Sequence, residues 1–125
     1  MTLLKKNLGQ WGEQAALHYL EGQGFKVLAT NVRNKIGEID IVAKEGDAFC
    51  FIEVRTKSTD QVGHPFESIT QSKKRKIYKA ALWYIQENGL YDEPIRFDVV
   101  AVIPDMDGGQ PSIELLRDAF TIDHE

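Results

Sequence analysis

Two short runs of the sequence place carboxylates beside cations in a pattern that suits chemistry at a metal ion. The first is EIDI at residues 38–41, and the second is FIEVRTK at residues 51–57. Both are apolar enough to be strands, whose side chains alternate between two faces. Glu38 and Asp40 should therefore share one face of the first strand, while Ile39 and Ile41 take the other.

A tight turn between the two runs should bring their charged residues together. With residues 45–47 as a hairpin turn, the strands pair antiparallel. Asp40 then lies opposite about position 52, within one residue of Glu53. Arg55 and Lys57 share the face of Glu53 by the same alternation. Two carboxylates and at least one cation are thus expected at the same end of adjacent strands.

Such carboxylates repel one another and lose solvation unless something compensates. A divalent cation does so, because Mg²⁺ prefers one or two carboxylates together with water and phosphate oxygens. Such a metal activates water and stabilises the charge that develops on a phosphate under attack. A cross-strand network of Asp40–Arg55 and Glu53–Lys57 salt bridges explains the same pattern. Spacing alone leaves both interpretations open.

The elements that must position these residues follow from periodicity and turn residues. A helix over 7–23, stopped by Gly24, has one apolar stripe that includes Trp11. Gly89 is the expected cap of a second helix, which follows a loop at 58–66. The predicted order αβββαββ indicates an α/β fold with a mixed sheet flanked by helices. Its elements are a helix over 7–23, strands over 25–32, 38–43 and 49–55, a helix over 68–88, and strands over 97–103 and 113–116.

Composition and length limit the class of protein. A chain of 125 residues with 42% hydrophobic residues corresponds to one domain, 1–125, with a core of its own. A single cysteine excludes an internal disulfide and fits a reducing, cytoplasmic location. No segment approaches the roughly 20 apolar residues of a membrane span. We therefore expect a cytoplasmic protein with no membrane partner.

The charges are segregated along the chain. The net charge is −4, yet residues 1–86 carry 13 Lys and Arg against 9 Asp and Glu, and residues 87–125 carry 2 against 10. The strongest basic cluster falls on the second helix. A local positive field can hold a phosphate backbone even when the net charge is negative. The cluster is interpreted as a surface that contacts DNA phosphates without reading sequence; a solvated helix face is the alternative. It comprises Lys73, Lys74, Arg75, Lys76 and Lys79.

Several motifs together resemble the YraN family of bacterial proteins, which is grouped by fold with the PD-(D/E)xK nucleases and is similar to archaeal Holliday-junction resolvases. The motifs occur in the family's order over nearly the whole chain. They are Gly9-x-x-Gly12-Glu13, Asn31-x-Arg33, Gly37-Glu38-Ile39-Asp40, Phe51-Ile52-Glu53-Val54-Arg55, Lys73 and Arg96-Phe97-Asp98-Val99-Val100.

This resemblance implies a restriction-endonuclease-like αβββαβ core and a Mg²⁺- or Mn²⁺-dependent endonuclease that hydrolyses phosphodiester bonds in DNA, including branched or flapped structures. Asp40 would be the first metal ligand and Glu53 the second. Glu13 resembles the helical glutamate that completes such sites, and Glu38 is an additional acidic member. Resolvase relatives act as dimers because two symmetric strands are cut, so a homodimer is compatible with the resemblance.

Arg55 departs from the pattern, because it stands where lysine is usual. Arginine stays protonated, so Arg55 can orient water or phosphate but cannot act as a base. Lys57, further along the same face, is a substitute for the lysine. Two alternatives to an active nuclease follow. One is a nuclease-fold DNA-binding protein with weak or no catalysis, and the other is a protein-interaction module that uses the acidic C-terminal third.

Four other residues receive structural interpretations. Trp11 and Trp83 lie on apolar helical stripes and are expected in the core. Cys50 points away from the face of Glu53 and should be a small core residue. Asp98 begins a buried strand near Arg96 and is expected to be structural, either as a cap or in an ion pair.

Overall fold

The computed structural model describes residues 2–57 and 63–121, with side chains from residue 8 onward. Within these ranges no helix is long and apolar enough to cross a membrane. The order of helices and strands agrees with the predicted αβββαββ, with one added 3-10 turn, η1. The elements are α1 (Thr2–Gly22), β1 (Lys26–Arg33), β2 (Glu38–Glu45), β3 (Ala48–Thr56), η1 (Pro65–Ser68), α2 (Gln71–Asn88), β4 (Ile95–Ile103) and β5 (Ser112–Leu116).

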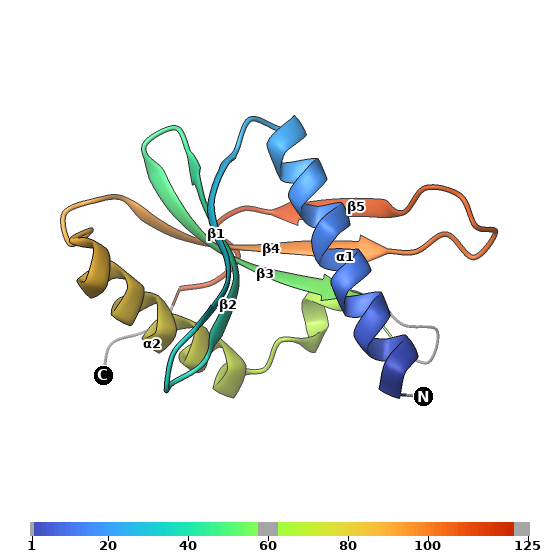
Figure 1. Ribbon diagram of the computed structural model, residues 1–125, viewed down its shortest axis with the longest axis horizontal. Helices are drawn as coiled ribbons and strands as arrows, with labels where there is room; N and C mark the ends of the chain where they lie inside the picture. The colour runs from blue at the N-terminus through green and yellow to red at the C-terminus, as the bar shows by residue number, and fades with distance from the viewer. Residues whose placement is uncertain (1, 58–62, 122–125) are drawn as a thin grey trace.

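The strands form one sheet in the order β1-β2-β3-β4-β5. Neighbouring strands are antiparallel except β3 and β4, which are parallel and are connected through α2. A parallel connection needs a crossover of a dozen or more residues, which the segment containing η1 and α2 provides. The sheet is therefore mixed, as predicted, and the α/β architecture agrees with a nuclease-like αβββαβ core (Figure 1).

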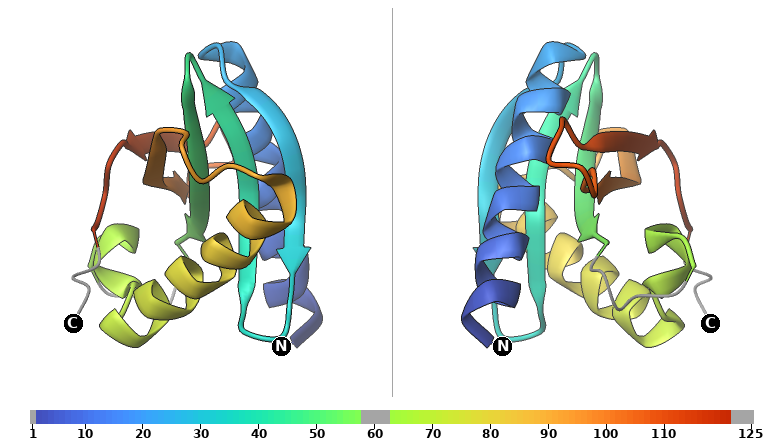
Figure 2. Two further views of the ribbon diagram at one scale, coloured as in Figure 1. Left: turned by 90° about the vertical axis from the view of Figure 1, so that its left-hand side faces the viewer. Right: turned by 90° about the vertical axis from the view of Figure 1, so that its right-hand side faces the viewer.

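The two helices cover opposite faces of the sheet (Figures 1 and 2). Ala16 and Leu20 of α1 pack on one face, and Ile77 and Ile85 of α2 pack on the other. β3 is buried on both faces at its centre, which explains its continuous apolar run. Cys50 lies in the α1-side core and is fully buried, as predicted, and burial raises the pKa of its thiol to about 12.

An ion network joins β2, β4 and the segment after β5 at the end of the sheet near the β2–β3 turn. Arg96 donates to Asp98 from Nε (2.8 Å) and Nη2 (2.9 Å), which confirms the ion pair. Arg96 Nη2 also donates to Glu45 Oε1 at 2.6 Å, and Arg117 binds Glu45 through Nε and Nη2. Hydrogen bonds from Arg117, followed by those from Arg96, lower the pKa of Glu45 to about 2. The network fixes this end of β2, β4 and the segment after β5.

The predicted boundaries of both helices were wrong at their N-terminal ends. α1 begins at Thr2 rather than residue 7. α2 begins at Gln71 rather than residue 68, because Thr70 is an extended N-cap whose side chain accepts from Lys73 N. The apolar periodicity could not reveal this, since Ile69 is buried in phase with the helix although it caps η1.

The prediction that both tryptophans are core residues was also wrong. Trp11 is 41% exposed and Trp83 is 47% exposed. The face of α1 that meets the sheet is formed by Gly12, Ala16 and Leu20, four residues apart, and Trp11 stands at its border. Trp83 projects away from the buried stripe of α2. Small residues at the helix–sheet contact leave the large rings outside.

Candidate functional site

The two predicted metal-binding carboxylates meet where β2 and β3 separate. The β2–β3 register ends at the pair Ile41–Ile52, and the next positions are Asp40 and Glu53. Figure 1 shows the two strands running apart beyond this point. Asp40 Oδ2 accepts a hydrogen bond from Val54 N at 2.8 Å. A side-chain carboxylate thus partners a β3 amide beyond the end of the β2–β3 ladder.

A break in the alternation of β2 accompanies this geometry. Ile39 and Ile41 were predicted to share a face, and this was wrong: Ile39 lies in the α2-side core and Ile41 in the α1-side core. Asn31 falls between the β1–β2 pairs that flank Asp40, and its φ of 51° is in the left-handed region. Such a residue distorts the local pleat and redirects side chains. Sequence alternation could not predict that distortion.

The Asp40–Glu53 pair is electrostatically unusual. Glu53 is only 5% exposed, and its Oε2 has no hydrogen-bond partner. Burial, then the hydrogen bond and charge of Glu53, raise the pKa of Asp40 to about 8. The Val54 amide and the charge of Lys73 oppose this rise in pKa. Two neighbouring carboxylates repel each other when both are ionised, so the pair retains a proton near neutral pH.

Two cations approach Glu53, one from each of two elements. Lys73 of α2 places Nζ 3.1 Å from Glu53 Oε2, and Arg55 of β3 places Nη1 3.9 Å from the same oxygen. The Lys73 contact is therefore one of charge, without hydrogen-bond geometry at Oε2. Arg55 Nε donates to Ser68 Oγ at 2.8 Å, and Ser68 Oγ donates to Pro65 O at 2.6 Å. Arg55 is thereby fixed by η1.

The ion pairs differ from those of the cross-strand network considered from the sequence. Glu53 pairs with Lys73 and Arg55, so neither an Asp40–Arg55 nor a Glu53–Lys57 pair exists among the described residues. Lys57 follows the end of β3, and its backbone N–H donates to Val102 O. It does not line the cavities around Asp40 and Glu53. Lys73, predicted only as a DNA contact, takes the place nearest Glu53.

Glu13 reaches the site because α1 lies directly on the end of β3. A Cβ at Gly12 would stand 1.9 Å from Thr56 Oγ1, so only glycine fits this contact. Burial and then the charge of Asp40 raise the pKa of Glu13, and a hydrogen bond from the Asn31 side chain opposes the rise. Asn31 belongs to a motif quoted above but was not predicted as a site residue. Its left-handed backbone could not be inferred from the sequence.

Glu38 stands at the edge of the site. It is exposed and pairs with Arg33 across β1 and β2, with Oε1 3.4 Å from Arg33 Nε. It lines two cavities together with Asp40. Glu13 and Glu38 thus lie near the Asp40–Glu53 pair, and their role as metal ligands stays a prediction.

Asp40 is common to three adjoining polar cavities. One of about 360 Å³ lies beside α2 and includes Glu53, Lys73 and Lys76. One of about 690 Å³ lies beside α1 and includes Glu13. The third, of about 340 Å³, is lined by both Asp40 and Glu53 and by residues of both helices. The carboxylate pair is therefore accessible from the sides of both helices.

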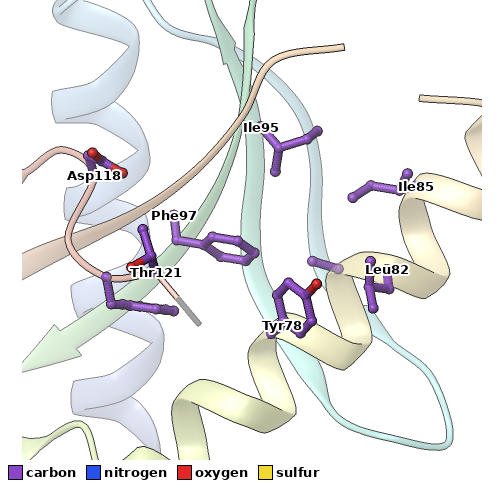
Figure 3. A pocket seen from close by; sticks show the side chains of 9 residues that line it. Tyr78, Leu82, Ile85, Ile95, Phe97, Asp118 and Thr121 are labelled. Atoms are coloured by element: carbon purple, nitrogen blue, oxygen red, sulfur yellow. The ribbon is translucent and has the colours of Figure 1, made fainter. Parts of the chain in front are cut away.

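A further cavity, of about 290 Å³, differs in chemistry. It lies between α2, β4 and the C-terminal segment, as Figure 3 shows for Tyr78, Ile85 and Phe97. Asp118 is the single carboxylate among its lining residues, and the others are mostly apolar. It offers no pair of acids and is not the candidate site.

The basic cluster of α2 divides between two sides of the helix. Lys73 and Lys76 line the cavity that contains Asp40 and Glu53. Lys74 Nζ lies 5.6 Å from the centroid of the Phe120 ring instead. Arg75 and Lys79 are exposed. Lys73 and Lys76 therefore lie next to the carboxylates, and contact of the basic cluster with DNA phosphates stays a prediction.

The donor set suits a hard divalent cation. No group of three or more His, Cys, Asp or Glu side chains within the described ranges is close enough to hold a metal by itself. Asp40 and Glu53 form a pair with one buried oxygen lacking a hydrogen bond. Mg²⁺ and Mn²⁺ use oxygen ligands, and Mg²⁺ commonly binds one or two carboxylates with water and phosphate completing its shell. The pair fits that requirement and lacks the nitrogen and sulfur ligands of a structural zinc site.

Comparison with known proteins gives a consistent family assignment. The family model described as "Uncharacterised protein family UPF0102" matches residues 12–102. A UPF0102 protein of Clostridium kluyveri is 43% identical over 122 residues, covering 98% of this chain and 100% of its own length. A UPF0102 protein of Clostridioides difficile is 46% identical over 97 residues, covering 78% and 85% respectively. These names state no activity.

Proposed function

The chain belongs to the uncharacterised UPF0102 family, the YraN family that its motifs resemble, and we propose that it is a metal-dependent endonuclease that hydrolyses phosphodiester bonds in DNA. The observation that carries this proposal is the Asp40–Glu53 pair, in which Glu53 is buried and Asp40 is half-buried. Its two carboxylates retain a proton, and one oxygen lacks a hydrogen bond. Removing such a pair of carboxylates from water destabilises the folded protein. A functional reason for keeping the pair is therefore favoured.

Each residue of the site has a chemical role in this proposal. Asp40 and Glu53 would hold the metal, and the pair would give up its proton on binding it. Bound Mg²⁺ or Mn²⁺ supplies Lewis-acid activation of water and charge stabilisation at the phosphate. Arg55, fixed by Ser68, orients a phosphate oxygen or water through a permanent charge. Glu13 orients water from the α1 side.

The DNA backbone would reach the site along the Lys73–Lys76 side of α2. These lysines line the cavity that contains the carboxylates, so a phosphate they hold lies near the proposed metal. The preference for branched or flapped DNA, and the homodimer that paired cuts require, rest on the resemblance to resolvases. A cytoplasmic location accords with the free, buried Cys50.

The test is cleavage of labelled single strands, duplexes, flaps and four-way junctions with Mg²⁺, Mn²⁺ or EDTA. Wild type is compared with Asp40→Ala and Glu53→Ala, and with Asp47→Ala as a matched control, since Asp47 is an exposed acid in the β2–β3 turn. We expect metal-dependent cleavage that both site variants lose and the control keeps. Equal cleavage by wild type and Asp40→Ala contradicts the proposal.

A second candidate is a nuclease-fold DNA-binding protein without catalysis. It is favoured by Arg55, which stands where lysine is usual and whose Nε is bonded to Ser68. In this case no variant cleaves and Asp40→Ala keeps the DNA affinity of wild type. The affinity still falls steeply with salt, because phosphate contacts release counterions. DNA affinity and cleavage measured on the same preparations separate the two candidates.

A further inference from the structure

We infer that Lys73 is a positioning residue that changes partners when the metal binds. Before binding, its ammonium group pairs with Glu53, and the metal then displaces it toward the substrate phosphate. This inference rests on the proposed metal site and adds an exchange of partners to it. Lys73 Nζ lies 3.1 Å from Glu53 Oε2, the buried oxygen that has no hydrogen bond. The ammonium group neutralises the charge of this oxygen, so a divalent cation that binds there must displace it.

The two partners differ in freedom of movement. The Glu53 side chain is 5% exposed, whereas the Lys73 side chain is 44% exposed. The backbone of Lys73 is fixed, because its N–H donates to the Thr70 N-cap at 3.1 Å. The ammonium group can therefore leave Glu53 by side-chain rotation alone, without opening the core. Arg55 cannot exchange in this way while its Nε is bonded to Ser68.

The position of Lys73 in α2 is unfavourable for helix stability. Lys73 is the third residue of α2, and the first turn contains no acidic residue. This position commonly carries Glu or Gln, whose side chain returns to the N-cap, and cations are disfavoured at a helix N-terminus. Lys74 adds a second cation beside it. A residue that lowers helix stability and also lines a cavity, as Lys73 does, is expected where function requires it.

The cavity supplies the second partner for the displaced ammonium group. Lys73 and Lys76 line it together with Asp40 and Glu53. Once a metal neutralises the carboxylates, the nearest anion available to Lys73 is a phosphate oxygen of DNA entering this cavity. The residue thus exchanges a carboxylate for a phosphate as the site is loaded.

The experiment is a calorimetric titration of the full chain with Mn²⁺ alone, without DNA. Wild type is compared with Lys73→Met, Lys73→Arg and Lys79→Met, the last being an exposed lysine of the same helix that does not line the cavity. Loss of the competing charge at Lys73→Met should tighten Mn²⁺ binding by about tenfold. Lys73→Arg keeps the charge and should bind like wild type, and Lys79→Met should change affinity less than about twofold.

A thermal unfolding series on the same variants provides the second measurement. In EDTA, Lys73→Met should have a lower Tm than Lys79→Met, because the Asp40–Glu53 pair loses its nearest cation. Saturating Mn²⁺ should remove that difference. A merely structural lysine would lower the Tm equally with and without metal.

The outcomes separate this inference from the proposed nuclease activity. If wild type binds Mn²⁺ and Lys73→Met binds it no more tightly, the exchange is wrong and the metal site stands. If Lys73→Met binds more tightly but wild type cleaves no DNA, the exchange stands and the nuclease proposal fails. If neither protein binds Mn²⁺, both are wrong.

Discussion

Asp40 holds its proton to an unusually high pH because burial and Glu53 disfavour its charge. Its pKa is raised to about 8 in the folded protein, whereas an unfolded aspartate ionises near pH 4. Unfolding therefore releases a proton between these values. By linkage, the stability of the metal-free protein should fall as pH rises through this window.

Asp40→Asn should remove this loss of stability. We expect a higher Tm than wild type at about pH 8 in EDTA, and little difference at about pH 4. The asparagine carbonyl can still accept from Val54 N, so the backbone contact is kept. Asp47→Asn, an exposed substitution, is the control and should follow wild type. A Tm of Asp40→Asn below that of wild type at about pH 8 would contradict this origin of the pKa shift.

The same proton should be visible in metal binding. Because a metal binds the ionised carboxylates, Mn²⁺ must displace the proton of the pair below about pH 8. Mn²⁺ affinity should rise with pH, by up to about tenfold per pH unit, and level off above that point. Calorimetry in two buffers of different ionisation enthalpy measures the released protons. No proton release at about pH 6 would exclude the shared proton.

At the scale of elements, the contact of α1 with β3 depends on Gly12. Gly12→Ala should push Thr56 and the helix apart, destabilise the protein by about 1–3 kcal/mol and move Glu13 away from Asp40. Gly9→Ala is the matched control, since nothing lies within 4 Å of its added Cβ. That change should stabilise α1 by about 0.5–1 kcal/mol, because glycine is a poor helix former. Urea unfolding checks both, and equal effects would contradict the packing argument.

The order of elements was predictable because each apolar run has the period of its own structure. The short β2–β3 turn also predicted that Asp40 lies within one residue of the position opposite Glu53, and the register that ends at Ile41–Ile52 agrees with this. The direction of the Asp40 side chain did not, because it accompanies the left-handed Asn31 on the neighbouring strand. Neither did the true start of α2, since Thr70 and Ile69 belong to a cap and a 3-10 turn that apolar periodicity cannot distinguish from helix.

The contribution of Lys73 to the site was equally hidden. A run of basic residues predicts a charged helix, but the side that meets the cavity depends on how α2 rotates against the sheet. Ile77 and Ala81 fix that rotation by packing on the α2-side core. As a result Lys73 and Lys76 face the carboxylates, whereas Lys74 contacts Phe120.

At the scale of the molecule, basic and acidic residues lie in different parts of the structure. The basic residues near the site lie on α2. Asp105 and Asp107 belong to the turn between β4 and β5, and β5 is the edge strand of the sheet opposite β1. Lys76→Met should weaken DNA binding and lower the log–log salt slope by about one unit. Asp105→Asn should leave both nearly unchanged. Fluorescence anisotropy of labelled DNA in EDTA over a salt series checks this, and a larger effect at Asp105 would place the DNA elsewhere.

The bond from Val54 N to Asp40 Oδ2 makes one backbone amide a spectroscopic reporter. Its ¹H–¹⁵N resonance should move with the protonation of Asp40 and again with metal binding. Neighbouring amides toward the β2–β3 turn are paired within the sheet and should change far less. A single cross-peak could therefore follow the site in solution, without DNA and without a measurement of cleavage.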